Sequence, residues 1–316
     1  MSKVVLHIGQ QKTASTSLQK FWQKNRKSLR SQGVLYPKSL GDMKQISLLR
    51  DYEKLSDSQS SLHKKVIKEI EGSNCPTVLL SEENLYVCKP HIREVIYKFL
   101  QDAFEEIEIV VFLRRQEEHI PSHYQQVVKG KTHLSLDQWI DKILSVKTNY
   151  YKYDIVLSQW QELFADHKIT MIPFNRVQSG SIHERSLELL EINEFSSFDF
   201  NIPRENKSWD QASVQLFQAV NSLAIKDKPV VTEKTRTNLR SYLLNRQGAH
   251  GAKLVLTQEQ IDRIRDKTYK SNQSLIKALN LNDVDAAYFK DHVQARESSP
   301  VDMAELLKIW IEFTQS

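Results

Sequence analysis

Residues 4–21, VVLHIGQQKTASTSLQKF, predict a β-strand, a tight turn and an α-helix in direct succession. The stretch opens with mostly apolar residues, which is typical of a buried strand, and the strand ends at Gly9. We expect the helix to begin at about Thr16 and to direct Leu18 into the core. The first amide groups of a helix have no acceptor within it, and the helix dipole adds partial positive charge there. The turn is therefore a suitable site for an anion.

The turn carries one cation and several hydroxyl groups where such an anion would lie. These side chains are Lys12, Thr13, Ser15, Thr16 and Ser17. They suit a phosphate or a sulfate group, because both accept hydrogen bonds from ammonium and hydroxyl groups. The spacing differs from the GxxxxGK[ST] loop of nucleotide triphosphatases, since Gly9 stands three residues before Lys12 and Ala14 follows where a glycine is expected. A turn that only caps the helix is the alternative for this stretch.

Composition limits the class of protein. The chain has 316 residues, 40% of them hydrophobic, which is enough to bury a full core. The formal charge of +5, from 44 basic and 39 acidic residues, fits a protein that handles anions but does not predict nucleic-acid binding. Two cysteines, Cys75 and Cys88, are too few for a disulfide framework. Because Met1 leads almost directly into the first strand and no apolar run approaches the ~20 residues of a membrane span, a soluble cytoplasmic protein is expected.

Strands and helices alternate in the first half of the chain. Buried strands are predicted at 77–81, 107–113 and 169–173, with an edge strand at 34–36. Helices are predicted at 17–32, 62–70, 91–104, 121–129, 136–144, 153–164, 184–190, 211–224, 235–244, 259–279 and 301–313, and a surface loop with short helix at 38–61. The alternation predicts an α/β fold, with a central parallel sheet between two layers of helices. We expect a single domain over 1–316, with an α/β core at 1–175 and a mostly helical part at 176–316.

Polar residues follow several of the predicted strands. Because parallel sheets bind ligands at the carboxyl ends of their strands, the turn after the first strand, Ser81–Asn84 and Arg114 are expected along one rim. Ser122 stands eight residues after Arg114, and we expect the next helix to begin at Pro121, with Ser122 in its first turn. A guanidinium and a helix start can bind one phosphate together. The alternative is that Arg114 is a solvated charge or a structural ion pair.

HIGQQKTASTSLQ at 7–19 and IVVFLRRQEEHIPSHYQQ at 109–126 together resemble the phosphate-binding motifs of sulfotransferases that use 3′-phosphoadenosine 5′-phosphosulfate (PAPS). The first is similar to the 5′-phosphosulfate loop, in the HIGxxKTGTTSLQ form of bacterial and carbohydrate-directed members. The second is similar to the 3′-phosphate motif, an arginine at a strand end and a serine eight residues later. Weaker likeness is present at 81–85, 149–164 and 204–208. The resemblance implies a P-loop-like α/β fold.

The resemblance also implies roles for individual residues. The residues implied to hold the 5′-phosphosulfate are Gly9, Lys12, Thr13, Ala14, Ser15, Thr16 and Ser17, and Arg114 and Ser122 would hold the 3′-phosphate. PAPS would be the co-substrate and 3′-phosphoadenosine 5′-phosphate (PAP) the product, with no metal. Ala14 replaces a glycine of the family loop, so a positive φ there would cost about 1 kcal/mol. The Arg-Lys-Gly motif of many members is absent, and 204–208, 246–253 or nothing replaces it.

Sulfuryl transfer resembles phosphoryl transfer, so positioning and charge stabilisation are expected to supply most of the rate. We predict that Lys12 stabilises the leaving phosphate oxygen. In the family that the chain resembles, a glutamate or histidine is the base, and Glu83 is the first candidate here, followed by Glu82, His7 and His123. The alternatives are that Glu83 only caps the next segment and that His7 is a core histidine.

The resemblance thus implies a sulfotransferase that acts on a hydroxyl group, and its carbohydrate-directed form implies a carbohydrate or glycolipid acceptor. A P-loop kinase or triphosphatase and a non-catalytic nucleotide-binding protein are the alternatives, and the loop spacing disfavours the first. His119 and His123 stand four residues apart, but Pro121 between them and the lack of a third ligand nearby disfavour a metal site. Candidates for an acceptor groove, or for the core, are Tyr150, Tyr151, Tyr153 and Trp160.

Overall fold

The computed structural model describes residues 3–145, 149–174, 182–203, 208–223, 231–246, 252–290, 295 and 301–315. The chain forms two compact units, which are described separately. Unit 1 comprises Met1–Arg114, Lys152–Arg204 and Ser271–Phe289, and unit 2 comprises Arg115–Tyr151, Glu205–Lys270 and Lys290–Ser316. Unit 1 therefore takes residues from both of the parts expected at 1–175 and 176–316, and the single sulfotransferase-like domain stays a prediction.

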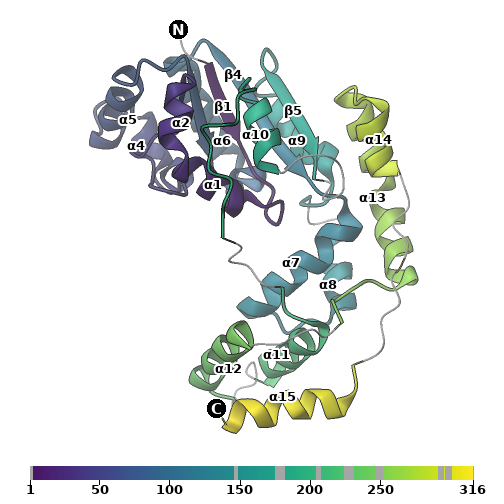
Figure 1. Ribbon diagram of the computed structural model, residues 1–316. Helices are drawn as coiled ribbons and strands as arrows, with labels where there is room; N and C mark the ends of the chain where they lie inside the picture. The colour runs from purple at the N-terminus through teal and green to yellow at the C-terminus, as the bar shows by residue number, and fades with distance from the viewer. Residues whose placement is uncertain are drawn as a thin grey trace. The chain divides into compact units, whose positions relative to one another are not determined.

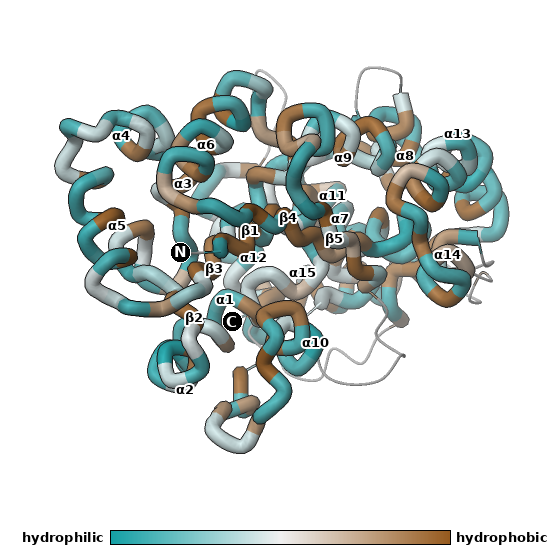
Figure 2. The backbone as a smooth tube through the Cα atoms, turned by 90° about the horizontal axis from the view of Figure 1, so that it is seen from above, coloured by the Kyte–Doolittle hydropathy of each residue, from teal (hydrophilic) through white to brown (hydrophobic). Residues whose placement is uncertain are grey.

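Unit 1 is built on a five-stranded, all-parallel sheet in the order β2-β3-β1-β4-β5. The strands are β1 (Lys3–His7), β2 (Val34–Leu35), β3 (Thr77–Ser81), β4 (Glu106–Leu113) and β5 (Lys168–Pro173). Their central residues are mostly apolar because helices cover both faces of the sheet. Figure 2 shows α1, α2 and α10 on one side of the strands and α6 and α9 on the other. The predicted strands and the predicted α/β fold are confirmed.

The order of the strands creates a site for a ligand at the end of β1. In register, His7 lies opposite Ser81 of β3 and Val110 of β4. The chain first adds β2 and β3 on one side of β1 and then crosses to add β4 and β5 on the other. Where the direction of winding reverses, the loops after neighbouring strands separate and leave a crevice at the carboxyl edge. The loop that follows β1 lies at this point (Figure 1).

The helices assigned wholly to unit 1 are α1 (Ser15–Lys24), α2 (Arg26–Ser31), α3 (Ser47–Arg50), α4 (Tyr52–Ser56), α5 (Ser61–Glu71), the 3₁₀ helix η1 (Glu83–Val87), α6 (Pro90–Ala103), α9 (Tyr153–Gln161) and α10 (Ile182–Glu188). Helix α14 (Asp283–Lys290) belongs to unit 1 up to Phe289. Phe21 and Trp22 of α1 join Leu187 of α10 in one apolar cluster against Val110 and Phe112 of the sheet. This cluster fixes the position of α1, so that the start of the helix lies near the end of β1.

The helix predicted at 17–32 is instead two helices, α1 and α2, and Asn25 separates them. The Asn25 side-chain amide and its backbone N–H both donate to the Phe21 carbonyl, each at 3.0 Å, and its Oδ1 accepts from Asp199 N at 2.8 Å. An asparagine that bonds the backbone locally competes with helix continuation.

The segment 38–61 contains the short helices expected, but Leu40 and Leu48 are fully buried, so the prediction that it lies on the surface is wrong for these residues.

The helices assigned wholly to unit 2 are α7 (Gln116–Gly130), α8 (Leu136–Ile143), α11 (Gln211–Leu223), α12 (Glu233–Asn245) and α15 (Met303–Gln315). Helix α13 (Gln258–Ala278) belongs to unit 2 up to Lys270. Within unit 2, α11 packs against α7, α12 and α15. The remaining predicted helices are confirmed to within three residues at each end, except the one predicted at 121–129. Among the described residues, no helix combines the length and apolar character needed to cross a membrane.

Candidate anion-binding site

The loop between β1 and α1, residues 8–14, is the predicted anion cradle, and its backbone is strained. Gly9 has a φ of 85°, and two residues that carry side chains, Lys12 and Ala14, have φ values of 65° and 62°. A left-handed conformation costs an L-residue roughly 1–2 kcal/mol. Such strain persists where surrounding contacts impose it, and it is concentrated at ligand-binding and catalytic sites. The backbone of the cradle loop is therefore typical of a ligand-binding site.

The cradle loop leads directly to the start of α1. The helix begins at Ser15, one residue before the expected position, and Ala14 is its N-cap. Within the described chain, no side chain caps α1 at this end. Because the first amides of a helix have no acceptor inside it, those of Ser15 and Thr16 are suited to an anion placed before the helix. The alternative of a hydroxyl-rich turn that only caps its own helix does not fit this loop.

The hydroxyl groups of the cradle loop divide into two kinds. Thr13 Oγ1 and Ser15 Oγ, both buried, donate to the Gln10 carbonyl at 2.6 and 3.1 Å. A hydroxyl has only one proton, so in this arrangement both side chains use theirs to hold the shape of the loop. Their role as side-chain donors to an anion stays a prediction. The Ser17 hydroxyl lies 3.0 Å from His183 Nε2, and Thr16 is half-buried.

Glu83, the first candidate base, lies against the cradle loop. A Cβ atom at Gly9 would stand 2.4 Å from Glu83 Cα and 2.5 Å from the Glu83 carbonyl oxygen, so only glycine allows this approach. Beside it, Gln11 Nε2 donates to Asn84 Oδ1 at 2.7 Å. The start of η1 therefore contacts the cradle loop at two points, and the expected placing of both segments on one rim is confirmed.

The two glutamates of this rim have different partners. The Glu83 carboxylate forms an ion pair with Lys44 at 3.2 Å, and its side chain is 17% exposed. Glu82 is buried, and its Oε1 accepts from the Asn84 N–H at 3.1 Å and from Asn84 Nδ2 at 2.7 Å. The capping role that was the alternative for Glu83 thus belongs to Glu82. Glu83 keeps its carboxylate at the partly exposed rim, while Glu82 is committed to the start of η1.

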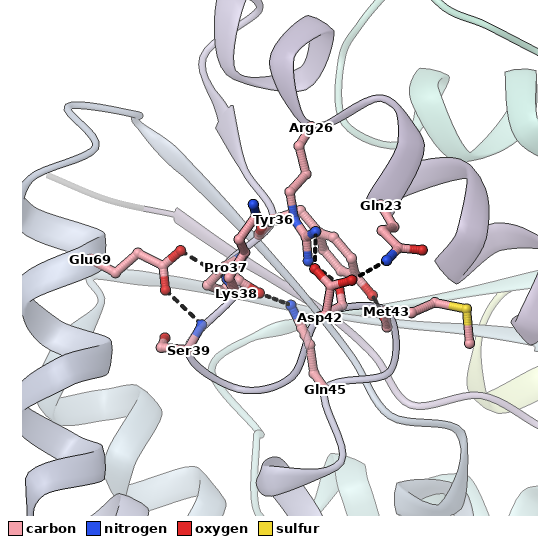
Figure 3. A network of polar contacts seen from close by, with 10 residues as sticks. All are labelled: Gln23, Arg26, Tyr36, Pro37, Lys38, Ser39, Asp42, Met43, Gln45 and Glu69. Carbon is pink, nitrogen blue, oxygen red and sulfur yellow. Dashed lines mark hydrogen bonds and ion pairs between the residues drawn. The ribbon is translucent and has the colours of Figure 1, made fainter.

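Lys44 belongs to the segment 36–45, which several hydrogen bonds hold in place. Figure 3 shows other residues of this segment and their partners. The Glu69 carboxylate of α5 accepts hydrogen bonds from two consecutive amides of this segment at 2.8 Å each. Gln45, fully buried, accepts from Ser81 N of β3 at 2.7 Å. The ammonium that pairs with Glu83 is therefore presented by a segment tied to both a helix and the sheet. Sequence reasoning did not find Lys44, because nothing in its local pattern indicates this pairing.

His7, a further candidate base, lies in the core. Its side chain is 1% exposed, and its ring packs edge-on against Trp22 and Phe112 at centroid distances of 5.6 Å. Its Nδ1 lies 2.8 Å from the Ser81 hydroxyl. Burial lowers the pKa of His7 to about 3, which makes the ring a weak base that is neutral at neutral pH. This environment matches the alternative interpretation of His7 as a core histidine.

Arg114 directly follows β4, at the carboxyl end of the strand beside β1. Its backbone N–H donates to Gln10 Oε1 at 3.2 Å, so the end of β4 is bonded to the cradle loop. The guanidinium carbon lies 5.9 Å from the centre of the Phe174 ring. Gln10, which is fully buried, is a site residue that the sequence analysis missed. Its only signal was its place between Gly9 and Lys12.

Ser122 is not at a helix start, so that prediction is wrong. Helix α7 begins at Gln116, and Pro121 lies inside it. Two acidic residues in the first turn, Glu117 and Glu118, favour this earlier start because they complement the positive end of the helix dipole. Ser122 therefore lies beyond the turn whose amides lack helical acceptors. It belongs to unit 2, and a phosphate shared with Arg114 stays a prediction.

The remaining candidate base, His123, is part of an aromatic group in unit 2. His119 Nδ1 and His123 Nδ1 both lie within hydrogen-bond distance of the Tyr151 hydroxyl, at 2.9 and 2.8 Å. Tyr151 is buried, so this hydroxyl holds the two imidazoles inside the unit. Among the described residues, no group of three potential ligands is arranged for a metal ion.

Of the segments expected to replace the Arg-Lys-Gly motif, 204–207 and 247–251 lie outside the described residues.

Replacing Ala14 with glycine is expected to stabilise the protein by roughly 0.5–1 kcal/mol. Glycine removes the cost of a left-handed alanine and loses part of that gain to the greater entropy of the unfolded chain. The free energy of unfolding in urea measures this effect. Ala304→Gly, in the exposed face of α15, is the matched control and should have the opposite sign. A destabilised Ala14→Gly would contradict the strained loop.

Comparisons with known proteins identify no family for the chain. No family model matches it, and no curated protein matches it. Among solved structures, the chain is similar to a sulfotransferase from Alicyclobacillus acidocaldarius, with a TM-score of 0.48 and 12% sequence identity, over 88% of this chain and 96% of that one.

Proposed function

We propose that this chain is a sulfotransferase that transfers the sulfuryl group of PAPS to an acceptor hydroxyl. The observation that carries the proposal is the cradle loop. It places Lys12 and the uncapped start of α1 at the end of the central strand. The same loop lies against Glu83, and Gln10 of the loop accepts a hydrogen bond from the backbone N–H of Arg114. An anion site, a carboxylate and a second cation on one rim are the groups that this reaction requires.

In the proposed complex, the 5′-phosphate of the donor binds before α1, and Arg114 binds the 3′-phosphate. Glu83 takes the proton of the acceptor hydroxyl as the acceptor oxygen forms its bond to sulfur. The bond between sulfur and the bridging oxygen breaks, and the electron pair stays on the 5′-phosphate. Lys12 stabilises the charge that develops there, so its interaction is stronger in the transition state than in the ground state. Lys44 holds the Glu83 carboxylate in place.

For the acceptor, we propose a hydroxyl of a carbohydrate or glycolipid. The support is the likeness of HIGQQKTASTSLQ to the loop of carbohydrate-directed sulfotransferases. A panel of oligosaccharides, glycolipids, phenols and amines, incubated with PAPS and analysed by mass spectrometry, tests this choice directly. Sulfation of phenols or amines alone would contradict it while leaving the donor half of the proposal intact.

The experiment that tests the donor is calorimetric titration with PAP, AMP and ATP in the absence of magnesium. We expect the protein to bind PAP more tightly than AMP. Arg114→Ala should weaken PAP binding by about 10- to 100-fold, because it removes a charge-assisted contact to phosphate. Arg185→Ala, which removes an exposed guanidinium that pairs with Glu188 in the same unit, is the matched control and should bind as wild type.

Two results would overturn the proposal. A preference for ATP that requires magnesium would favour a kinase or triphosphatase. Tight PAP binding without transfer to any acceptor of the panel would favour a non-catalytic nucleotide-binding protein. In either case the cradle loop would still bind an anion, but Glu83 would have no part in sulfuryl transfer.

A further inference from the structure

Three hydrogen bonds form a closed ring between Gln10, Arg114 and Tyr153 in unit 1. The Arg114 N–H donates to Gln10 Oε1 at 3.2 Å, and Gln10 Nε2 donates to the Tyr153 hydroxyl at 3.2 Å. The Tyr153 hydroxyl donates to the Arg114 carbonyl at 2.5 Å and closes the ring. Each donor and acceptor is used consistently. We call this ring the Arg114 clasp.

The Arg114 clasp fixes the backbone of one residue from both sides. Its bonds involve both the N–H and the C=O of Arg114, where the chain has already left the ladder of β4. Gln10 and Tyr153 are fully buried. Hydrogen bonds in such surroundings are shielded from water, and leaving one partner unsatisfied is costly. The base of the Arg114 side chain is therefore held in one orientation.

The same glutamine also shapes the cradle loop. Through its main-chain carbonyl, Gln10 accepts from Thr13 Oγ1 and Ser15 Oγ, and through its side chain it binds Arg114. One buried residue thus connects the loop proposed for the 5′-phosphate with the arginine proposed for the 3′-phosphate. The third member, Tyr153, is the first residue of α9. The clasp therefore also connects the cradle loop and Arg114 to this helix.

We propose that the Arg114 clasp sets the distance between the two phosphate-binding groups and thereby makes the site selective for a nucleotide that carries both phosphates. Gln10 and Tyr153 are then positioning residues that act through Arg114. This inference rests on the proposed function. A ligand with two phosphates gains most from two sites at a fixed separation, because no free energy is spent on bringing them into place. A ligand with only the 5′-phosphate gains little from it.

The test is the ratio of the affinities for PAP and AMP in Tyr153→Phe, measured by calorimetry on the full chain. The substitution removes the hydroxyl and keeps the ring, which packs edge-on against Phe289 at 6.3 Å. Loss of the clasp should lower the ratio about fivefold, the effect of roughly one hydrogen bond, while AMP affinity stays within about twofold of wild type. Gln10→Met, which breaks the two bonds made by the Gln10 amide, should lower the same ratio.

Two residues shown in Figure 3 provide matched controls in the same unit. Tyr36 is also buried, and its hydroxyl donates to a carbonyl, that of Met43, at 2.6 Å. Gln45 is, like Gln10, fully buried and bonded through both ends of its amide. Tyr36→Phe and Gln45→Met should lower the melting temperature and leave the ratio of affinities unchanged. These variants separate loss of a buried hydrogen bond from loss of the clasp.

The possible results separate a failure of the role assigned to the clasp from a failure of the proposed function. An unchanged ratio in Tyr153→Phe, or an equal fall in the affinities for PAP and AMP, would overturn the inference and leave the proposed function standing. A fall of the ratio in Tyr36→Phe as large as in Tyr153→Phe would also overturn it. If the wild-type protein itself binds AMP as tightly as PAP, the proposed function fails first, and with it the selectivity assigned to the clasp.

Discussion

Lys12→Ala is expected to lower the rate of PAP formation from PAPS by roughly 10²- to 10³-fold, the effect of removing one group that stabilises developing charge. Lys12 is half-buried, lies in the cradle loop and has a φ of 65°. In the proposed mechanism, its ammonium is the cation that stabilises the leaving oxygen. Chromatography of the nucleotides in the presence of acceptor measures the rate. Alanine keeps a side chain at the strained position, so the free energy of unfolding should change little.

Two control variants separate this role from a general effect of charge. Lys27→Ala removes an exposed lysine of α2 from the same unit and should leave the rate unchanged. Lys12→Arg keeps the charge on a longer, planar group and should recover only part of the rate. Transfer at the wild-type rate in Lys12→Ala would remove this residue from the mechanism.

Gly9→Ala is expected to destabilise the protein by roughly 3 kcal/mol or more, through overpacking and a left-handed alanine together. The new methyl group would stand 2.4–2.8 Å from three backbone atoms of Glu83, none of which can turn aside as a side chain can. Either the loop or the start of η1 has to move. Urea denaturation measures the loss of stability, and the same variant should lose PAP binding.

Gly130→Ala serves as the comparison, since a Cβ atom at Gly130 would meet nothing within 4 Å. Its free energy of unfolding should stay within about 0.5 kcal/mol of wild type. A Gly9→Ala variant as stable as wild type, with unchanged binding, would show that the cradle loop and Glu83 are farther apart than described here.

The strands of the sheet could be predicted because each is an apolar run that ends at a polar or turn-forming residue. Such runs belong to strands buried on both faces, and they form one parallel sheet as expected. The cost expected for a positive φ at Ala14 also follows from sequence, and the structure has that φ, at 62°. These features depend on residues that are near one another in the chain.

Features that depend on distant residues could not be predicted in the same way. Gln10 has no local pattern that indicates its bonds to Arg114 and Tyr153, which stand more than 100 residues away in sequence. The pairing of Lys44 with Glu83 could not be predicted either, because the two residues are far apart in the sequence. The start of α7 was placed too late because Pro121 suits the first turn of a helix, while the acidic residues before it favour an earlier start.

The closed form of the cradle loop has a consequence for the kinetics of binding. Thr13 and Ser15 both bond to the Gln10 carbonyl, so side chains of the loop itself hold its shape. Association then needs no slow ordering step, and its rate depends on diffusion and on the attraction between the phosphates and Lys12. Differences in affinity among nucleotides should accordingly lie in how long each one stays bound.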